Sequence, residues 1–146
     1  MKTWVKAVWS VDKKLEQIVA ALDKKIMSAA LSGGGYGEAL TQCHKVMRLL
    51  EVKRVTVNMR ALKHAMARAL GGEDIRLLEA RFGEDRPLTR LAEEFGVGRF
   101  ALGKMIETAL GRCVEAVKEA GYGGADFEDD YGDIHIFREA YDKAEQ

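Results

Sequence analysis

The residues whose side chains suit a recognition chemistry lie together between Arg99 and Lys104. Arg99 and Lys104 carry nitrogen donors that can bond to a base edge or to a phosphate oxygen. Phe100 and Ala101 can touch the methyl group of a thymine, and Gly103 has no side chain to keep a ligand away from the backbone. The same stretch has few polar side chains and could equally form an apolar patch that faces another protein. The sequence therefore leaves two alternatives for this stretch, contact with nucleic acid and contact with another protein.

Two further arginines extend the candidate region to residues 88–112. Arg90 precedes the stretch and Arg112 follows it, and both carry guanidinium donors of the kind that bond to phosphates. They complete a set of predicted DNA-contacting residues with Arg99, Phe100, Ala101, Gly103 and Lys104.

A corner between two helices must position these side chains. Residues 88–95 are predicted to form a supporting helix, and a second helix is predicted from Arg99 to about Ala120. Gly96 lies where the chain leaves the first helix, a position that favours a positive φ and therefore glycine. Ala92 lies four residues earlier, where the first helix must approach the second. The remaining apolar contacts across the corner are predicted from Val97, Leu102 and Met105.

Three short motifs include and surround this corner. They read LLxxRFG at 77–83, LxxLAEEFGVxR at 88–99 and Ala109-Leu110. They cover about 40 of the 146 residues and reach neither the first 70 nor the last 25. On these motifs the chain resembles region four of sigma factors, and the small, often phage-encoded, sigma-like transcription regulators that carry such a domain.

The resemblance implies a function as well as a fold. Region four of sigma factors binds the −35 promoter element and the flap of RNA polymerase. The resemblance therefore implies a transcription regulator in which a helix-turn-helix domain at residues 73–121 binds double-stranded DNA, with its recognition helix, residues 99–112, in the major groove. RNA polymerase is a second expected partner. The alternative is a protein-protein interaction module that keeps this fold with a weakened or lost DNA-reading face, and docks RNA polymerase or another protein through Phe100 and Ala101.

Length and composition fit an all-α chain that forms one domain, or one small domain with an appendage. The 146 residues are 47% hydrophobic and 32% charged, include one proline, and show no sustained alternation of apolar and polar residues. No run of about 18 apolar residues predicts a membrane span, and the first residues do not read as a secretion signal. Cys43 and Cys113 are predicted to be buried free thiols of a protein in the reducing cytoplasm.

The net charge is zero, but its sign changes along the chain. Residues 1–70 carry 13 Lys and Arg against 5 Asp and Glu, residues 71–120 carry 8 against 10, and residues 121–146 carry 2 against 8. The corresponding net charges are +8, −2 and −6. A basic surface for nucleic acid and an acidic tail folded over a basic helix are both compatible with this split.

Residues 1–70 are predicted to form a long N-terminal helical hairpin that packs on the helix-turn-helix domain. Apolar residues recur every three or four positions from residue 2 to 31 and again from 38 to 70, on either side of a glycine-rich turn at 32–37. Trp4 belongs to the first stripe and is predicted to anchor the core. Trp9 lies off that stripe and is a candidate for a partner contact. The β-branched segment 52–58 could bend or break the second helix.

The second helix of the hairpin carries a basic outer face. A solvated surface, phosphate contacts and a seat for the acidic tail are three alternatives for this face. A hairpin this long leaves apolar surface exposed unless another domain or a second copy of the chain covers it, so homodimerisation is also expected. The basic residues are Lys45, Arg48, Lys53, Arg54, Arg60, Lys63 and Arg68.

The acidic C-terminal tail, residues 122–146, begins with a glycine-rich linker and is predicted to contain one short helix from about Asp133 to Ala144. Its apolar side chains are too numerous to leave in water, so the tail is predicted to dock on the body of the protein. These side chains are Phe127, Ile134, Ile136, Phe137 and Tyr141.

Other site chemistries find no support in the sequence. Adjacent Cys43 and His44 point about 100° apart on a helix, and His64 does not complete a set at ligand spacing, so no metal site is expected. The acidic run after Asp126 lacks the glycine that a calcium loop requires, and the glycines at 33–37 lack a following Gly-Lys-Ser/Thr. No nucleophile motif or paired acid is present, so neither an enzyme nor a cofactor is expected.

Overall fold

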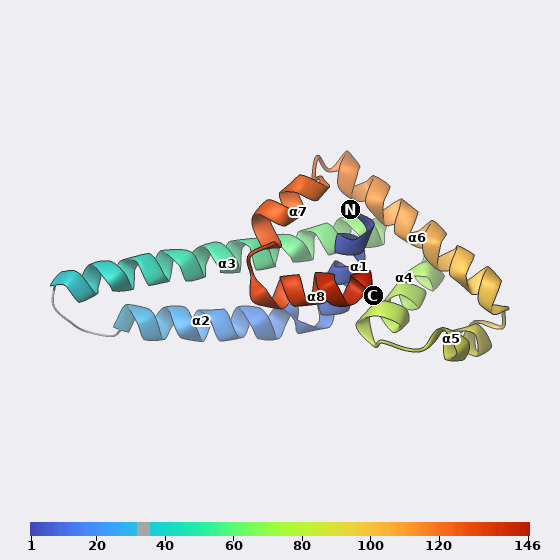
Figure 1. The fold of residues 1–146 in the computed structure, drawn as a ribbon, viewed down its shortest axis with the longest axis horizontal. Helices are drawn as coiled ribbons and strands as arrows, with labels where there is room; N and C mark the ends of the chain where they lie inside the picture. Colours follow the sequence, from blue (N-terminus) through green and yellow to red (C-terminus); the bar gives the residue numbers. More distant parts are fainter. Residues whose placement is uncertain (32–35) are drawn as a thin grey trace. The chain divides into compact units, whose positions relative to one another are not determined.

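The structure, a computed structural model, describes residues 1–31 and 36–146, and the regular structure in these ranges is helical (Figure 1). This confirms the all-α class. Within the described part, no helix has an apolar stretch long enough to cross a bilayer. The expected turn at 32–37 falls outside the described residues, apart from its last two positions. The elements are α1 (Lys2–Val11), the 3-10 turn η1 (Asp12–Lys14), α2 (Leu15–Leu31), α3 (Tyr36–Arg68), α4 (Gly72–Leu78), the π-helical turn η2 (Glu79–Gly83), α5 (Leu88–Phe95), α6 (Arg99–Glu119), α7 (Gly124–Tyr131) and α8 (His135–Glu145).

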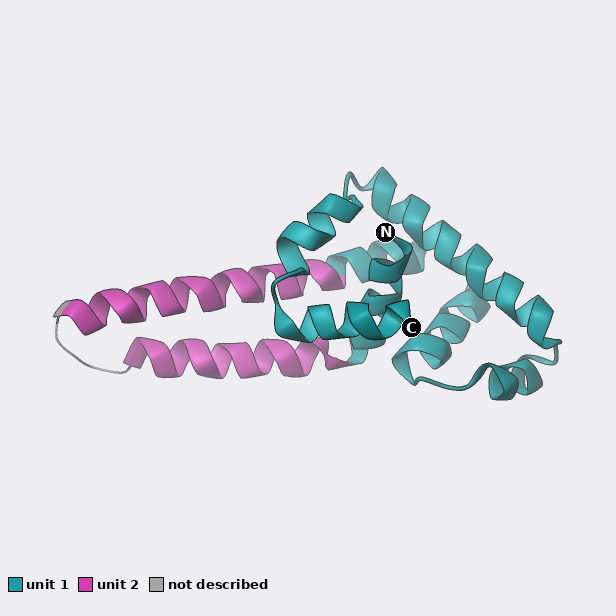
Figure 2. Cartoon of the chain, viewed as in Figure 1, with its two compact units in different colours: residues 1–13, 61–146 teal, residues 14–60 magenta. Residues whose placement is uncertain are grey.

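The chain divides into two compact units (Figure 2). One consists of residues 1–13 and 61–146, and the other of residues 14–60. This division differs from the expected boundaries after residues 70 and 121, because α1 contacts α6, η2 and α8. The first helix and the C-terminal tail therefore belong to the same unit as residues 73–121.

α1 lies in the interior of the first unit, which corrects two expectations for the N-terminus. The helix predicted from residue 2 to 31 is divided by the 3-10 turn Asp12–Lys14. Trp9, expected to face a partner, is only 1% exposed. Because α6, η2 and α8 all contact α1, positions off its main apolar stripe are buried too. The buried side chains of α1 are Trp4, Val5, Ala7, Val8, Trp9 and Val11.

Lys63, near the end of α3, connects three parts of the first unit. Its Nζ lies 3.2 Å from Asp12 Oδ2, 3.9 Å from Glu79 Oε1 and 5.5 Å from the centre of the Trp9 ring. Its side chain is only 18% exposed. Lys63 therefore holds the end of α1 to η2 instead of contributing to an open basic face.

Residues 122–146 form two helices, and not the single short helix that was expected. α7 begins inside the expected linker, where Asp126 Oδ2 accepts a hydrogen bond from the Gly123 backbone N–H at 2.7 Å and closes the first turn. The tail docks on α1, as its apolar side chains predict. The rings of Phe127 and Tyr141 lie 5.7 and 4.5 Å from the ring of Trp4, centre to centre.

The second unit consists of α2 and the part of α3 up to Arg60. Glu16 Oε1 lies 2.6 Å from Arg60 Nη2, and Asp23 Oδ1 lies 2.6 Å from Lys53 Nζ. Because residues early in α2 meet residues late in this part of α3, the two helices run antiparallel.

α3 continues unbroken through residues 52–58. Thr56 in this β-branched segment is buried, and its Oγ1 donates to the Val52 carbonyl oxygen at 2.7 Å, so its hydroxyl is satisfied within the helix.

Cys43, expected to be buried, is exposed on α3, whereas Cys113 is buried as expected. Cys43 lies ten residues before Lys53, about 80° around α3 from the side chain that pairs with Asp23 of α2, so it is off the face of α3 that meets α2.

Candidate nucleic-acid interface

Gly96 turns the chain between α5 and α6. It has φ 65° and ψ 33°, the left-handed conformation predicted for this position. The backbone N–H groups of Gly96 and Val97 donate to the carbonyl oxygens of Glu93 and Ala92, at 3.2 and 3.0 Å, and close the end of α5. Gly98 then takes an extended conformation and is followed directly by α6. The direction of α6 is thus set by three residues.

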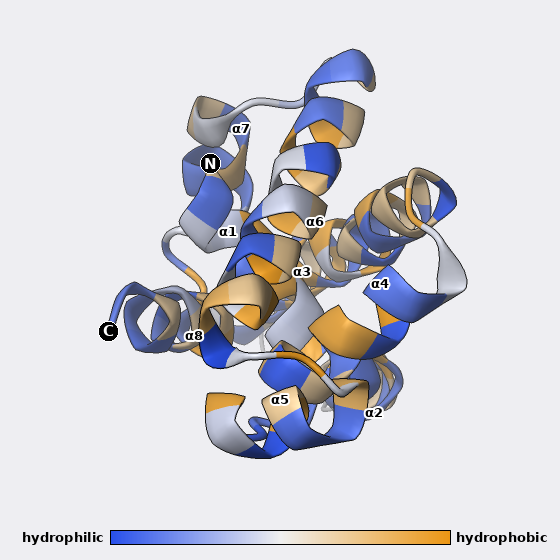
Figure 3. Ribbon diagram, turned by 90° about the vertical axis from the view of Figure 1, so that its right-hand side faces the viewer, coloured by the Kyte–Doolittle hydropathy of each residue, from blue (hydrophilic) through white to orange (hydrophobic). Residues whose placement is uncertain are grey.

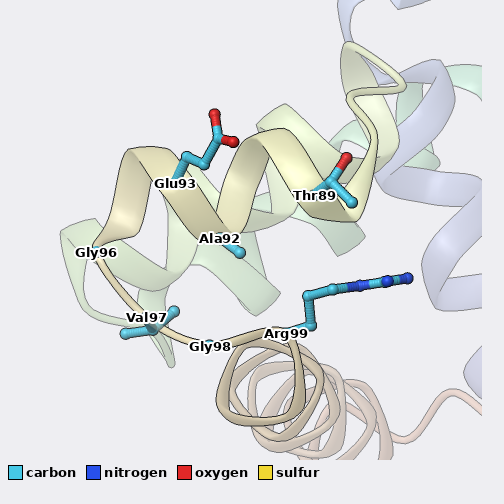
Figure 4. Close-up of a pocket in the computed structure, with 7 residues that line it drawn as sticks. All are labelled: Thr89, Ala92, Glu93, Gly96, Val97, Gly98 and Arg99. Atoms are coloured by element: carbon cyan, nitrogen blue, oxygen red, sulfur yellow. The ribbon is translucent and has the colours of Figure 1, made fainter.

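α5 packs against α6 through small and apolar side chains. Ala92 is 7% exposed and points from α5 toward the first turn of α6 (Figure 4). Leu91 and Leu102 are fully buried, which confirms the prediction for Leu102. Val97 and Met105 are half-buried and so lie at the edge of this contact. Hydrophilic and hydrophobic residues alternate along α6, as expected of a helix with one buried face (Figure 3).

Two arginines outside the corner help to hold α5 in place. The guanidinium carbon of Arg76, on α4, lies 5.4 Å from the centre of the Phe95 ring. Arg86 Nη1 lies 2.7 Å from Glu94 Oε2. Each contact is exposed and contributes at most about 1 kcal/mol. Together the two contacts hold α5 to α4 and to the segment that precedes α5.

The first turns of α6 form an exposed surface. Arg99, Ala101 and Lys104 are exposed, and Gly103 is half-buried. Phe100 is 78% exposed, the highest value among the exposed large apolar residues in the described part of the chain. The N-terminal end of α6 has no side-chain cap, so its first N–H groups and the helix dipole add partial positive charge to the two side-chain cations.

Shallow hollows lie on both sides of Arg99. The first lies between α5 and α6, where the Arg99 side chain projects from the start of α6 (Figure 4). The second follows α6 and contains four of the predicted contact residues. The first is lined by Thr89, Ala92, Glu93, Gly96, Val97, Gly98 and Arg99, and the second by Arg99, Phe100, Gly103, Lys104, Glu107 and Thr108.

The structure does not bring Arg112 to this surface. Arg112 lies 13 residues after Arg99 on α6, about 20 Å along the helix. Its Nη1 is 3.3 Å from Asp74 Oδ2 on α4, so it links two helices of the first unit. Arg90 is exposed on α5 but lines neither hollow. The predicted residues that share one continuous surface are therefore Arg99, Phe100, Gly103 and Lys104, with Ala101 exposed beside them.

Glu107 and Thr108 belong to the second hollow but were not among the predicted residues. Both lie three or four residues after Lys104, a spacing that places them on the same helix face and could have identified them. Glu107 Oε2 lies 2.5 Å from Lys2 Nζ, and this hydrogen bond holds the pKa of Glu107 below its usual value. A carboxylate at this edge repels phosphate, and Lys2 of α1 offsets its charge. No local pattern predicts that long-range pair.

The chain matches no protein-family model, and comparisons with curated proteins and with solved structures find no match.

Proposed function

We propose that α5 and α6 form a helix-turn-helix that binds double-stranded DNA, with the first turns of α6 in the major groove. The observation that carries this proposal is the exposure of Arg99, Phe100, Ala101 and Lys104 together on the first two turns of α6, directly after the three-residue corner at 96–98. A recognition helix in this motif uses its N-terminal residues to contact base edges. The resemblance of residues 77–110 to region four of sigma factors favours the same orientation and a role in transcription regulation.

Each residue has a role that follows from its chemistry. Arg99 can bond to a guanine through two donors or to a phosphate, and Lys104 supplies a point charge for a phosphate. Phe100 and Ala101 suit apolar contact with a thymine methyl group. At Gly103 an added Cβ would meet nothing within 4 Å, so this position leaves room for a groove wall to approach the helix.

The test compares two lysines of the same helix. Lys104 and Lys118 are both exposed on α6 and lie 14 residues, about 21 Å, apart. We expect Lys104→Ala to weaken binding to a fluorescent duplex and to reduce the slope of log affinity against log salt by about 1. Lys118→Ala should leave both unchanged. Equal effects of the two substitutions would show that binding is diffuse and would contradict the proposed interface.

Whether the protein recognises a particular DNA sequence is tested by a second comparison. Anisotropy titrations should compare a random duplex pool with the DNA that flanks this protein's own gene, at several salt concentrations. Arg99→Ala should reduce the preference for one sequence over the pool, because base contacts carry sequence information and phosphate contacts do not. If no duplex binds even at about 50 mM salt, where phosphate contacts are strong, the DNA proposal fails.

The exposure of Phe100 favours a second candidate, a protein-protein interaction module. A phenylalanine that is 78% exposed is unusual on a surface that contacts only phosphates, and it suits a pocket on RNA polymerase or on another protein. Phe100→Gln separates the two functions because it removes the ring without adding charge. A DNA-binding surface should keep most of its affinity for duplex DNA, whereas a protein-docking surface should lose its partner.

A further inference from the structure

A row of exposed residues follows one face of α3 within the second unit. Its members recur at alternating spacings of three and four, the pattern of the contact positions of a coiled coil. Leu40, Met47, Leu50 and Val57 are 49%, 61%, 48% and 50% exposed. Single exposed apolar residues are common, but a row at this spacing forms a continuous face. This outer stripe consists of Leu40, Cys43, Met47, Leu50, Arg54 and Val57.

α2 occupies a different face of α3. Lys53 and Arg60 of α3 form ion pairs with Asp23 and Glu16 of α2. Lys53 directly precedes Arg54 of the outer stripe, so these side chains point about 100° apart. The faces of α2 and α3 that meet therefore cover each other, whereas the outer stripe lies on another face of α3 and is exposed to solvent.

We propose that the outer stripe pairs with the outer stripe of a second copy of this chain, with the two α3 helices antiparallel. The inference is independent of DNA binding. Each copy would contribute α2 and α3, and the product would be a four-helix bundle, the usual way in which two-helix hairpins cover their remaining apolar faces.

The order of residues along the stripe favours a second copy over an unrelated partner. Antiparallel pairing places Met47 of one copy opposite Leu50 of the other at the centre, and Leu40 opposite Val57 at each end. The stripe is therefore complementary to itself when its direction is reversed, as an interface with two-fold symmetry requires.

Charge selects the antiparallel direction. Parallel pairing would place the two Arg54 side chains opposite each other, and like charges at a contact position are unfavourable. Antiparallel pairing places each Arg54 opposite Cys43, a small residue. Each Arg54 can then keep its hydrogen bond to Glu51 of its own helix, at 2.6 Å from Nη2 to Oε1.

The size of the stripe predicts a weak, concentration-dependent dimer. It spans 18 residues, about 27 Å of helix, and two such faces bury on the order of 1,000 Å² in total, the lower end of specific interfaces. Analytical ultracentrifugation from about 1 to 100 μM should therefore resolve both the 16.2 kDa chain and a species of twice that mass.

A matched pair of methionines tests the location of the interface. Met47 lies in the outer stripe and Met27 lies on α2, and both are 61% exposed. We expect Met47→Glu to raise the dimer dissociation constant at least about tenfold, because it places a charge at the centre of the contact. Leu40→Glu should also raise the dimer dissociation constant, and Met27→Glu should leave this constant unchanged. Circular dichroism checks that each variant stays helical. A chain that is monomeric throughout, or a dimer that Met47→Glu does not weaken, overturns the proposal.

Disulfide trapping tests the direction of pairing. Arg54→Cys places a thiol opposite the native Cys43 of an antiparallel partner, so oxidised glutathione should produce a covalent dimer that disappears in Arg54→Cys with Cys43→Ser. The unmodified chain should cross-link slowly, because its two Cys43 thiols lie near opposite ends of the interface. Rapid cross-linking of the unmodified chain through Cys43, together with a cross-link through position 54 that persists in Arg54→Cys with Cys43→Ser, would indicate parallel pairing and overturn the proposed arrangement.

Discussion

Lys104 Nζ lies 4.8 Å from the centre of the Phe100 ring, one helical turn earlier on α6. A cation over an exposed ring contributes roughly 0.5 to 1 kcal/mol. This is small enough for a phosphate to compete for the same ammonium group. The contact therefore holds the two side chains together on the proposed recognition surface, and Lys104 can still bind a phosphate.

Phe100 should accordingly matter little for stability. We expect Phe100→Ala to lower the free energy of unfolding by no more than about 1 kcal/mol, the contribution of the lysine contact. Leu102, two residues later, is fully buried, and Leu102→Ala should lower it by about 2 to 5 kcal/mol. Urea denaturation measures both. If Phe100→Ala destabilised the protein as much as Leu102→Ala does, the ring would have to be covered and could not belong to an open recognition surface.

Gly96 should tolerate replacement poorly although space is available for a side chain. A Cβ at Gly96 would meet nothing within 4 Å, but its φ of 65° is unfavourable for other residues. Gly96→Ala should therefore lower the free energy of unfolding by about 1 to 2 kcal/mol, and Gly96→Asn should lower it less.

Gly111 provides the matched control for Gly96. It lies inside α6, has a helical conformation, and its added Cβ would also meet nothing within 4 Å. Gly111→Ala should stabilise the protein by about 0.5 to 1 kcal/mol, because alanine favours the helix. If both substitutions shifted the urea midpoint in the same direction, the backbone conformation of Gly96 would not be what restricts that position.

The parts of the fold that the sequence predicted are set by local rules. The all-helical class follows from apolar periodicity, and the bounds of α5 and α6 follow from Pro87, Gly96 and Gly121 at their ends. The left-handed conformation of Gly96 follows from its place after a helix. The exposure of Arg99, Phe100 and Lys104 also follows locally, because these residues lie off the apolar stripe of α6.

The features of the fold and of the site that the sequence did not predict depend on residues distant in the chain. Trp9 lies off the stripe of its own helix, and only the assembly of α6, η2 and α8 around α1 explains its burial. Arg112 was assigned to the predicted recognition surface because it is basic. In the structure its guanidinium group donates a hydrogen bond to Asp74 of α4, 38 residues earlier in the sequence. Long-range pairing of this kind leaves no periodic signal in a single sequence.

Burial of Cys113 predicts a specific loss of stability at high pH. The side chain is fully buried, and burial raises the pKa of its thiol from 9.0 to about 11. Below pH 9 the thiol is neutral in the folded and unfolded states alike, so its contribution to stability is fully present there. Between pH 9 and about 11 the unfolded chain loses this proton while the folded chain keeps it, so the stability of the fold decreases as the pH rises.

Two variants isolate this effect from the titration of other groups. In Cys43→Ser, which retains only Cys113, the free energy of unfolding should fall more steeply between pH 9 and 11 than in the variant that also carries Cys113→Ala. Equal slopes would mean that Cys113 has an ordinary pKa in the folded protein. A thiol reagent gives an independent measure, because only the thiolate of an accessible cysteine reacts. At pH 8, native Cys43→Ser should react far more slowly than the same variant unfolded in urea, and a fast native reaction would show that Cys113 is reached without unfolding.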